Sequence, residues 1–600
     1  MVSTYDFLII GLYLAFLASI GWFFRKLNQG STDYFAGGFR MTWWLVGAGS
    51  FASNFSCWAF TGAAHMAYTY GALIFGFFLM DALAFLVSYL WFAARLRQLR
   101  LVTAMDAVRL RFGLGSEQFF TWLGFINSLF IAAVWLVSLS IILSSAFNLP
   151  PVPVIVTTGV VVIAVALVGG SWAVAASDFV QLIVLLGVTV VIAALVLAKL
   201  GGIGPFLDQI PDGHWQVFHP TGSIPYDWLY LTTAFFSAVY ARNNLVNAGK
   251  YITAKDSKHA RRSSLIPFFG YIVMPVVWMI PPLAAFTLVP DLATRSFMTT
   301  PGEASYIAVC LAILPQGMIG LVIVCMFAAT MSSMDVALNK NAGFFVKNFY
   351  HPVLRPNARD SELLLAGKLS TIFFGGVITT IALLVVTKAQ ISLFDAFLYI
   401  GAYLGVPLAV PLLFGMLLRR VPRWAGWSTT LFGMLLTTII YVFAPTETGR
   451  LWLQPWLGET LYAYTLSNKF VVSNLVGAPL TALFFCATRL FYRVDADPAY
   501  NTTAHEFFRR MNTPVDFERE VGHDNTALQA RLVGRLTLAF GLFIAAMVLI
   551  PNPLSGRLSI LASAVIPLVI GTVLIRYARH RDSQSAAAAS IVAEAPAVLP

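Results

Sequence analysis

The sequence predicts an all-α polytopic membrane protein, and three observations support that fold class. Of 600 residues, 58% are hydrophobic and only 11% are charged, whereas soluble domains carry roughly 25% charged residues. Mean hydropathy is +0.78. Apolar runs of roughly 18 residues or more recur along the whole chain, and each is long enough to cross about 30 Å of hydrocarbon. There are too few charges to solvate the surface of a soluble protein of this size.

The apolar runs predict about fifteen helices, with bounds good to a few residues. In chain order they cover residues 5–24, 44–64, 71–94, 117–147, 152–170, 172–199, 225–248, 263–289, 305–347, 364–387, 392–418, 427–444, 467–490, 531–550 and 557–577. An odd number of spans places the two termini on opposite sides of the membrane.

The first apolar run is predicted to be a retained helix. A secretory signal has a basic stretch before its apolar core and a small-residue cleavage site after it. Here Asp6 precedes the run, and Arg25 and Lys26 follow it. This charge order predicts a helix with its N-terminus outside.

The cysteines show no paired spacing and all lie within apolar runs. They are therefore predicted to be small buried hydrophobic residues, with no disulfide framework or metal site. The four positions are Cys57, Cys310, Cys325 and Cys486.

The net charge of +11 orients the chain and does not indicate nucleic-acid binding. Basic residues gather in short loops at 95–111, 250–262 and 419–423, whereas the alternate loops 201–227 and 445–468 are nearly free of Lys and Arg. This pattern places the basic loops in the cytoplasm. It predicts a multi-pass protein of the cell inner membrane, with a cytoplasmic C-terminus.

The chain divides by composition into a long apolar part and a more polar C-terminal part. The polar segment 491–530 predicts a cytoplasmic loop with short amphipathic helices, and the Ala/Ser-rich end predicts disorder. The expected division is a transmembrane domain at 1–490 with core repeats at about 44–199 and 225–418, the loop at 491–530, two extra transmembrane helices at 531–577, and a disordered tail at 578–600.

Two of the predicted spans are too small or too polar to be plain lipid-facing helices. The second contains the small and polar run 47–56, and the seventh ends in Arg242, Asn243 and Asn244. Unwound backbone at membrane depth has to line a cavity or be buried in protein. Interrupted helices in corresponding positions of two halves indicate a transporter binding site.

Four ordered motifs over residues 5–490 resemble those of the sodium/solute symporter family, which includes sugar, proline and sialic acid carriers. They comprise the loop 33–38, the first core helix from Trp43 to Gly62, the fifth core helix with Gly169–Val174 and Asp178, and the eighth with Phe327–Ser333 and Asn339. The resemblance implies a LeuT-like 5+5 inverted repeat with one extra N-terminal helix and further C-terminal helices.

The resemblance also implies a Na⁺ site between the first and eighth core helices, with Na⁺ as the co-transported ion and no organic cofactor. Sodium is a hard cation that prefers oxygen ligands. The implied ligands are the backbone carbonyls of Ala52, Phe55 and Ala329 and the hydroxyls of Ser332 and Ser333.

Two intramembrane carboxylates are candidates for a second cation or a proton, because buried acids are costly and usually functional. Some family members hold a second sodium with the fifth-helix aspartate and eighth-helix serines. Here Asp178 matches that aspartate, but Asp335 stands at one of the serine positions. Two close acids can bind a cation or share a proton. Alternatively, Asp335 pairs with Lys340.

The predicted solute contacts lie on the interrupted helices and on the span that contains Asp81. Asp81 can meet a solute or a structural partner. Arg242 can bind a carboxylate in bidentate geometry, form a gate ion pair or extend to the cytoplasmic face. Sugar-carrying relatives show Glu-Gln where this chain has Trp58-Ala59. The solute is therefore left open as sugar, carboxylate or amino-acid-like. The candidate contacts are Ser53, Asn54, Trp58, Asp81, Asn243, Asn244 and Tyr399.

The predicted function is sodium-coupled symport of a small organic solute by alternating access. Proton or mixed-cation coupling is the first alternative, and a transporter-like sensor with 491–530 as its output is the second. No nucleophile set and no transition-metal spacing indicates an enzyme, and no partner beyond the solute and the lipid bilayer is expected.

Overall fold

The computed structural model describes residues 3–24, 39–167, 171–219, 226–294, 300–388, 392–493, 497–522 and 524–594. Side chains at 17–24, 171–174, 293–294, 336 and 585–594 are not described. The motif at 33–38 and the glycines at 169–170 lie outside the described residues.

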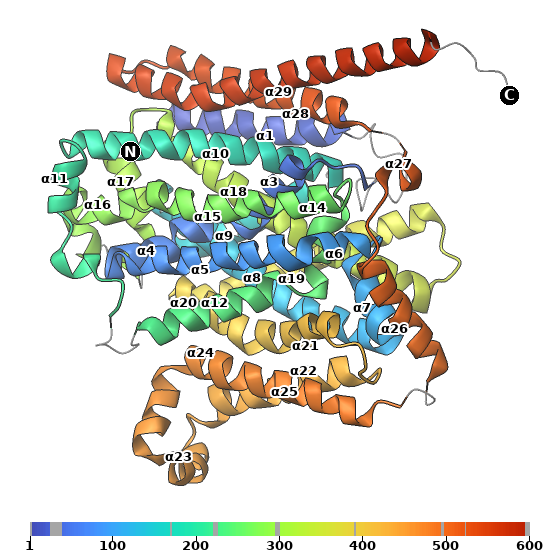
Figure 1. The fold of residues 1–600 in the computed structure, drawn as a ribbon. Helices are drawn as coiled ribbons and strands as arrows, with labels where there is room; N and C mark the ends of the chain where they lie inside the picture. The colour runs from blue at the N-terminus through green and yellow to red at the C-terminus, as the bar shows by residue number, and fades with distance from the viewer. Residues whose placement is uncertain are drawn as a thin grey trace.

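The described chain is nearly all helical, and its long helices run side by side (Figure 1). Eleven of the described helices are long and apolar enough to cross a membrane, and three more are shorter and apolar. The all-α membrane fold is confirmed, whereas the count of about fifteen helices is not.

The first half of the core begins after α1 (Thr4–Phe24). Its elements are α3 (Trp43–Asn54), η3 (Cys57–Phe60), α4 (Gly62–Tyr70), α5 (Leu73–Val87), η4 (Ser88–Phe92), α6 (Ala93–Gln98), α7 (Ala104–Phe112), α8 (Leu114–Phe147), α9 (Pro151–Ala166) and α10 (Ser171–Lys199). The short α11 (Ile203–Asp208) and η5 (Asp212–Trp215) connect it to the second half.

The second half has the same alternation of long and broken helices. Its elements are α12 (Trp228–Arg242), η6 (Leu245–Asn247), α13 (Ala248–Ile252), α14 (Ser257–Ser263), α15 (Leu265–Trp278), α16 (Ile280–Leu288), η7 (Pro290–Thr294), η8 (Pro301–Ala304), α17 (Ser305–Ile313), α18 (Met318–Phe344), η9 (Phe345–Leu354), α19 (Asp360–Lys388), α20 (Leu393–Ile400), η10 (Gly401–Gly405) and α21 (Val406–Leu417).

The remaining helices lie around this core (Figure 1). They are α22 (Ala425–Thr438), η11 (Ile439–Phe443), α23 (Glu447–Ser467), α24 (Lys469–Val472), η12 (Ser473–Gly477), α25 (Ala478–Ala487), η13 (Thr488–Phe491), α26 (Pro498–Met511), α27 (Phe517–Glu520), α28 (Thr526–Ala546), η15 (Met547–Leu549) and α29 (Leu554–Glu594). The last helix continues through much of the tail for which composition predicts disorder.

Both predicted interruptions are present. Helix α3 ends at Asn54, and Phe55 is extended (φ −119°, ψ 128°) before η3 begins. Helix α12 ends at Arg242, where Asn244 redirects the chain: its Nδ2 donates to the Tyr240 carbonyl at 2.9 Å, and its Oδ1 accepts from the Val246 amide at 3.0 Å. Such side chains compete with the helical ladder for backbone groups.

Two predicted elements differ from the structure. The single helix expected at 305–347 is two, because Gly317 is left-handed (φ 85°) between α17 and α18. The loop expected at 445–468 contains α23, which is kinked at Gly458 (φ 75°). Hydrophobic periodicity alone does not place such glycines: Gly317 is the N-cap of α18, three residues after Leu314, the C-cap of α17, and Gly458 lies at a kink inside α23.

Helix α18 lies at the centre of the molecule, where it contacts α1, α3, α8, α10 and α19. In the span that it begins, 94% of the most apolar stretch is buried. Its N-terminal turn is fixed by Asp6 of α1, whose Oδ1 accepts the Gly320 amide at 2.6 Å. The carboxylate satisfies one of the free amides that every helix start leaves.

Candidate sodium site and solute cavity

The break after α3 lies directly against α18. Ser333 Oγ donates to the Phe55 carbonyl at 2.9 Å and is 3.5 Å from the Ala329 carbonyl of its own helix. One residue past the break, the Cys57 amide donates to Thr330 Oγ1 at 3.2 Å. Two hydrogen bonds thus join the broken helix to α18. The Phe55 carbonyl, which accepts one of them, takes no part in helical hydrogen bonding.

The other expected sodium ligands surround the same junction. The Ala52 carbonyl accepts only a long 3.2 Å bond from the Phe55 amide. Ser332 is 2% exposed, and its Oγ makes no hydrogen bond within the usual distance and angle limits among the described residues. An unpaired buried hydroxyl costs free energy that a cation or water can recover.

Asp178 approaches this junction from α10. It is 3% exposed, neighbours Ser332 and interacts electrostatically with Asp335. A Cβ built on Gly49 of α3 would lie 3.6 Å from Asp178 Oδ2, so the carboxylate faces the broken helix. Asp335 Oδ1 is also buried without a hydrogen bond among the described residues. The structure therefore brings both candidate acids to Ser332.

The oxygen-rich junction suits a hard monovalent cation, because it offers carbonyl, hydroxyl and carboxylate oxygens. Transition-metal ligation has no comparable support: within the described residues, no group of three or more His, Cys, Asp or Glu side chains could hold a metal.

A cavity of about 400 Å³ lies beside the junction, between the two broken helices. Its walls come from α3 and η3, α5, α8, α12, α18, and α20 to α21. Aromatic side chains supply much of the lining: Phe55, Trp58, Phe77, Phe78, Phe120, Trp135, Tyr271, Phe344, Phe394, Phe397 and Phe470. A cavity with a mostly apolar wall and a few polar groups is typical of small-molecule sites.

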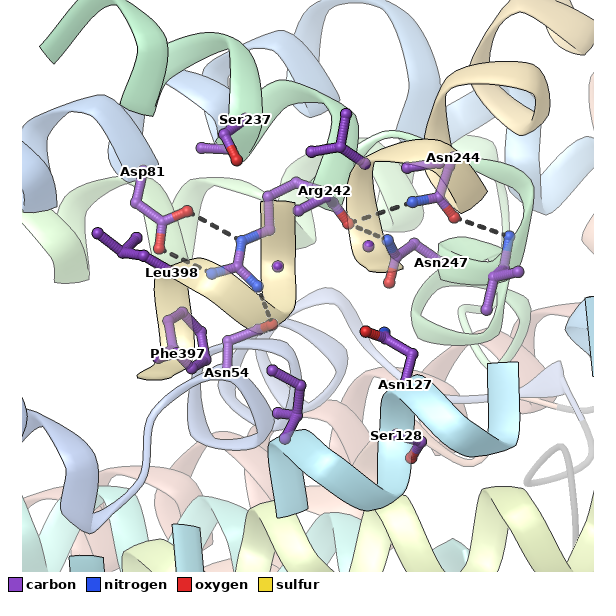
Figure 2. A pocket seen from close by; sticks show the side chains of 18 of the residues that line it. Asn54, Asp81, Asn127, Ser128, Ser237, Arg242, Asn244, Asn247, Phe397 and Leu398 are labelled. Atoms are coloured by element: carbon purple, nitrogen blue, oxygen red, sulfur yellow. Dashed lines mark hydrogen bonds and ion pairs between the residues drawn. The ribbon is translucent and has the colours of Figure 1, made fainter. Parts of the chain in front are cut away.

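An ion pair joins two walls of the cavity (Figure 2). Arg242 Nε and Nη2 donate to the two oxygens of Asp81 at 2.9 and 2.8 Å, in bidentate geometry. Arg242 Nη1 donates to Asn54 Oδ1 at 2.5 Å, and Lys250 Nζ donates to the same oxygen at 3.0 Å. Asp81 and Arg242 are therefore partners of each other in this structure. The side chains of Arg242 and Lys250 both donate to the same neutral oxygen, Asn54 Oδ1.

Trp58 lies in the wall of the cavity. Its Nε1 donates to the Leu393 carbonyl at 3.2 Å, and its ring lies 5.8 Å from Phe394 and 4.9 Å from Phe397. Phe77 of α5 meets Phe394 edge to face at 5.0 Å. These rings join η3, α5 and α20 into an aromatic cluster.

Five of the seven candidate solute contacts line the cavity: Ser53, Asn54, Trp58, Asp81 and Asn244. The other two lie elsewhere. Asn243 is 0% exposed and bonds to Ser88 and the Ala84 carbonyl, so its amide holds α12 against α5. Tyr399 meets Tyr441 edge to face at 5.8 Å. Because α12 ends at Arg242, the side chains of Asn243 and Asn244 point in different directions, and only Asn244 reaches the cavity. The order of residues in the sequence does not predict this difference.

The wall opposite Arg242 is polar and was not singled out from the sequence. Figure 2 shows Asn127 pointing from α8 toward the side of the cavity that holds Arg242, with Ser128 next to it on the same helix. Asn341 and Lys340 of α18 line the same wall. Lys340 is the sequence signal that could have pointed to this wall, because a cation within an apolar span needs a polar environment. From the sequence, Lys340 is expected only as a partner for Asp335.

Comparison with known proteins places these features in a family. The sodium:solute symporter family model matches residues 34–435. The sodium/glucose cotransporter 2 of Rattus norvegicus is 25% identical over 72% of this chain and 70% of its own length. The sodium/sialic acid symporter SiaT of Proteus mirabilis is 23% identical over 78% of this chain and 94% of its own.

Solved structures show the same fold. A Na⁺-coupled sialic acid symporter matches with a TM-score of 0.64 at 19% identity, over 80% of this chain and 98% of that one. Mhp1, a nucleobase-cation-symport-1 family transporter, matches with a TM-score of 0.51 at 14% identity, over 80% and 99%. The fold class is therefore the LeuT-like transporter fold.

The chain belongs to the sodium:solute symporter family. It is a multi-pass membrane protein whose relatives are transporters, it performs sodium-coupled symport, and Na⁺ is its co-transported ion.

Proposed function

We propose that this chain imports a small organic solute by binding Na⁺ at the junction of α3 and α18, with Ala52, Phe55, Ala329, Ser332 and Ser333 as ligands. The observation that carries the proposal is the contact between the freed Phe55 carbonyl and Ser333 Oγ at 2.9 Å. Sodium bound there bridges a broken helix and the central helix, and it thereby favours one arrangement of the two.

The solute occupies the neighbouring cavity, with Ser53, Asn54, Trp58 and Asn244 as contacts and the Asp81–Arg242 pair as a gate element. In this proposal the chain is a transporter and not an enzyme.

The orientation follows from charge. Helices α6, α7 and α14, which carry the basic loops, lie at one end of the long helices, and α1 begins at the other (Figure 1). The positive-inside rule makes the basic end cytoplasmic in the inner membrane, with the N-terminus outside. The segment 491–530 then lies in the cytoplasm.

A second coupling ion is supported by the meeting of Asp178, Asp335 and Ser332. Either a second Na⁺ or a proton neutralises this pair, because two buried like charges repel strongly when both are ionised.

Sodium-dependent stability tests the proposed site without knowledge of the solute. The purified full-length chain is heated in detergent in NaCl or in KCl at equal ionic strength. Wild type is expected to gain several degrees in NaCl, since a ligand that binds only the folded state stabilises it. Ser332→Ala is expected to lose most of that gain. Ser140→Ala, which removes another buried hydroxyl of the core, should keep it. Equal gains in all three proteins would reject the site.

A further inference from the structure

The cavity carries more positive charge than its acids can balance. Asp81 is fully engaged by Arg242 through two hydrogen bonds. Two more cations, Lys250 and Lys340, approach the same space. Neither forms an ion pair with a carboxylate in the part of the chain that the structure describes.

The hydrogen-bond and ring partners of the two lysines are neutral, and Lys250 interacts only at longer range with Asp81, the carboxylate that Arg242 already holds. Lys250 Nζ donates to Asn54 Oδ1 and lies 5.9 Å from the centre of the Phe85 ring. Lys340 Nζ lies 5.6 Å from the Phe344 ring centre and has no hydrogen bond among the described residues. A partly buried ammonium without a counter-ion is costly. Lys250 also repels Arg242 and Lys340, so the three cations share one region.

The wall around Lys340 supplies further hydrogen-bond donors. Ser128 Oγ accepts from Asn341 Nδ2 at 3.2 Å, which leaves the Ser128 hydroxyl proton available for a further acceptor. The Asn127 side chain is partly buried, and its oxygen is buried without a hydrogen-bond partner among the described residues. Because an amide can be turned about its last bond, Asn127 can present its NH₂ group to an acceptor. Polar side chains of α8 and α18 thus line the same cavity as the Lys340 ammonium group.

We infer that the transported solute is an organic anion, a carboxylate with an apolar body, whose charged group is recognised by Lys340 with Asn127 and Ser128. A carboxylate accepts several hydrogen bonds and neutralises an ammonium, and charge-assisted bonds of this kind are roughly twice as strong as neutral ones. The aromatic walls take the apolar body. This inference rests on the proposed transport function and goes beyond it by naming the class of solute.

The position of Lys340 links the anion to sodium. Lys340 is seven residues after Ser333 on the same helix, a distance of roughly 10 Å at 1.5 Å per residue. The proposed sodium ligand Ser333 and the proposed anion-binding residue Lys340 therefore lie on the same helix, α18. A sodium ion at Ser333 adds favourable charge for an anion nearby, and the positive cavity selects against cationic solutes.

Matched pairs of acids and their neutral analogues test the class of solute. The probes are phenylacetate with phenylacetamide, lactate with lactamide, gluconate with glucose, and N-acetylneuraminate with its methyl ester, each added to the purified full-length chain in constant NaCl. At least one acid is expected to raise Tm by about 2–4 °C, a shift typical of a 1 kcal/mol gain in a large domain. Its neutral analogue should have no effect.

Three variants assign the effect to Lys340. Lys340→Gln is expected to lose the response to the acid, and Lys340→Arg to keep most of it. Lys347→Gln, farther along the same span and outside the cavity lining, should respond like wild type. The inference is overturned if no acid stabilises wild type, if the neutral analogues stabilise it equally, or if Lys340→Gln responds fully.

The sodium response separates this inference from the function on which it rests. If NaCl stabilises wild type and Lys340→Gln alike while the acids have no effect, only the solute class is wrong. If NaCl stabilises neither protein, the sodium site itself fails.

Discussion

At the scale of single residues, Asp335 is the residue whose replacement tests which ion is coupled to transport. It lies two residues after Ser333 on α18 and interacts electrostatically with Asp178 of α10. One of its oxygens is buried without a hydrogen bond among the described residues. A carboxylate so placed either binds a cation or takes a proton, and the two cases respond differently to its removal.

The variant Asp335→Asn removes the charge and keeps the shape. We expect either fewer sodium ions bound per chain at saturation or a loss of the pH dependence of sodium binding. Equilibrium binding of ²²Na⁺ between pH 5.5 and 8.5 measures both. Asp360→Asn, at the exposed start of α19, is the control. Sodium binding that is unchanged in amount and in pH dependence would make Asp335 structural.

Residue types predicted the meeting of α3 and α18 better than the lining of the cavity. Small and hydroxyl residues at 52–55 and 329–333 carry their chemistry in the backbone or in short side chains, so position along the helix nearly determines where the oxygens lie. Asn243 and Lys340 differ, because a long or hydrogen-bonding side chain can face several neighbours. Their directions follow from tertiary contacts that no local pattern contains.

Helix α7 shows how a charged residue can serve as a structural element. Arg111, which the sequence indicates only as part of a basic loop, is 0% exposed. It donates to the Gly415 carbonyl at 2.8 Å, the Leu418 carbonyl at 2.7 Å and the Tyr500 hydroxyl at 2.7 Å. One guanidinium thus satisfies the carbonyls at the end of α21, which a helix end otherwise leaves unpaired.

Replacing Arg111 with Met should leave those carbonyls buried and unpaired, at a cost of about 2–3 kcal/mol. We expect a lower Tm for the purified chain, measured by thermal unfolding in detergent. Arg109→Met on the same helix removes a largely exposed guanidinium that lies 3.8 Å from Glu117, and it should change stability little. Similar Tm values for the two variants would contradict the capping role.

At the scale of helices, apolar runs and polar interruptions predicted most of the core, including both breaks. The division of 305–347 into α17 and α18 was not predictable from hydropathy, since Pro315 and Gly317 lie in an apolar run. Hydrophobic periodicity predicts which residues are buried, but it does not predict how the backbone turns between two buried segments.

The whole molecule is tied together at its basic end by a C-terminal strap, defined as residues 497–522 and 524–526. Arg100 donates two hydrogen bonds of 2.7 Å to Glu520, and Lys255 lies 2.6 Å from Asp524. Tyr500 reaches Arg111 and the Val421 carbonyl. The strap therefore joins the loops after α6 and α13 to the end of α21, which are segments far apart in sequence.

Protonation should loosen the strap. The hydrogen bonds from Arg100 lower the pKa of Glu520. At Asp524 burial alone would raise the pKa, but the hydrogen bonds from Lys255 and Thr526 outweigh burial, and the pKa of Asp524 is lowered. A lowered pKa in the folded state adds stability above the ordinary value of about 4.3 for Glu, and this stability is lost as pH falls through the folded pKa. We therefore expect amide hydrogen exchange in the strap to become faster than the intrinsic rate change explains as pH falls below about 4.3 and through the lower folded pKa of Glu520.

The variant Glu520→Gln should produce the same loosening at pH 7, with little change in Tm because exposed ion pairs contribute little to global stability. Glu518→Gln, on the same helix and without an ion pair among the described residues, should exchange like wild type. Equal protection in both variants would show that the ion pair does not hold the strap.

The central claim is that one sodium ion is bound between the broken helix α3 and the central helix α18. Equilibrium binding of ²²Na⁺ to the purified full-length chain measures it directly. Ser333→Ala removes a ligand hydroxyl that now contacts the Phe55 carbonyl, and a loss of roughly 1.4 kcal/mol or more predicts at least a tenfold weaker Kd. Ser140→Ala should bind as wild type does. Sodium binding of equal affinity in wild type and Ser333→Ala would contradict the claim.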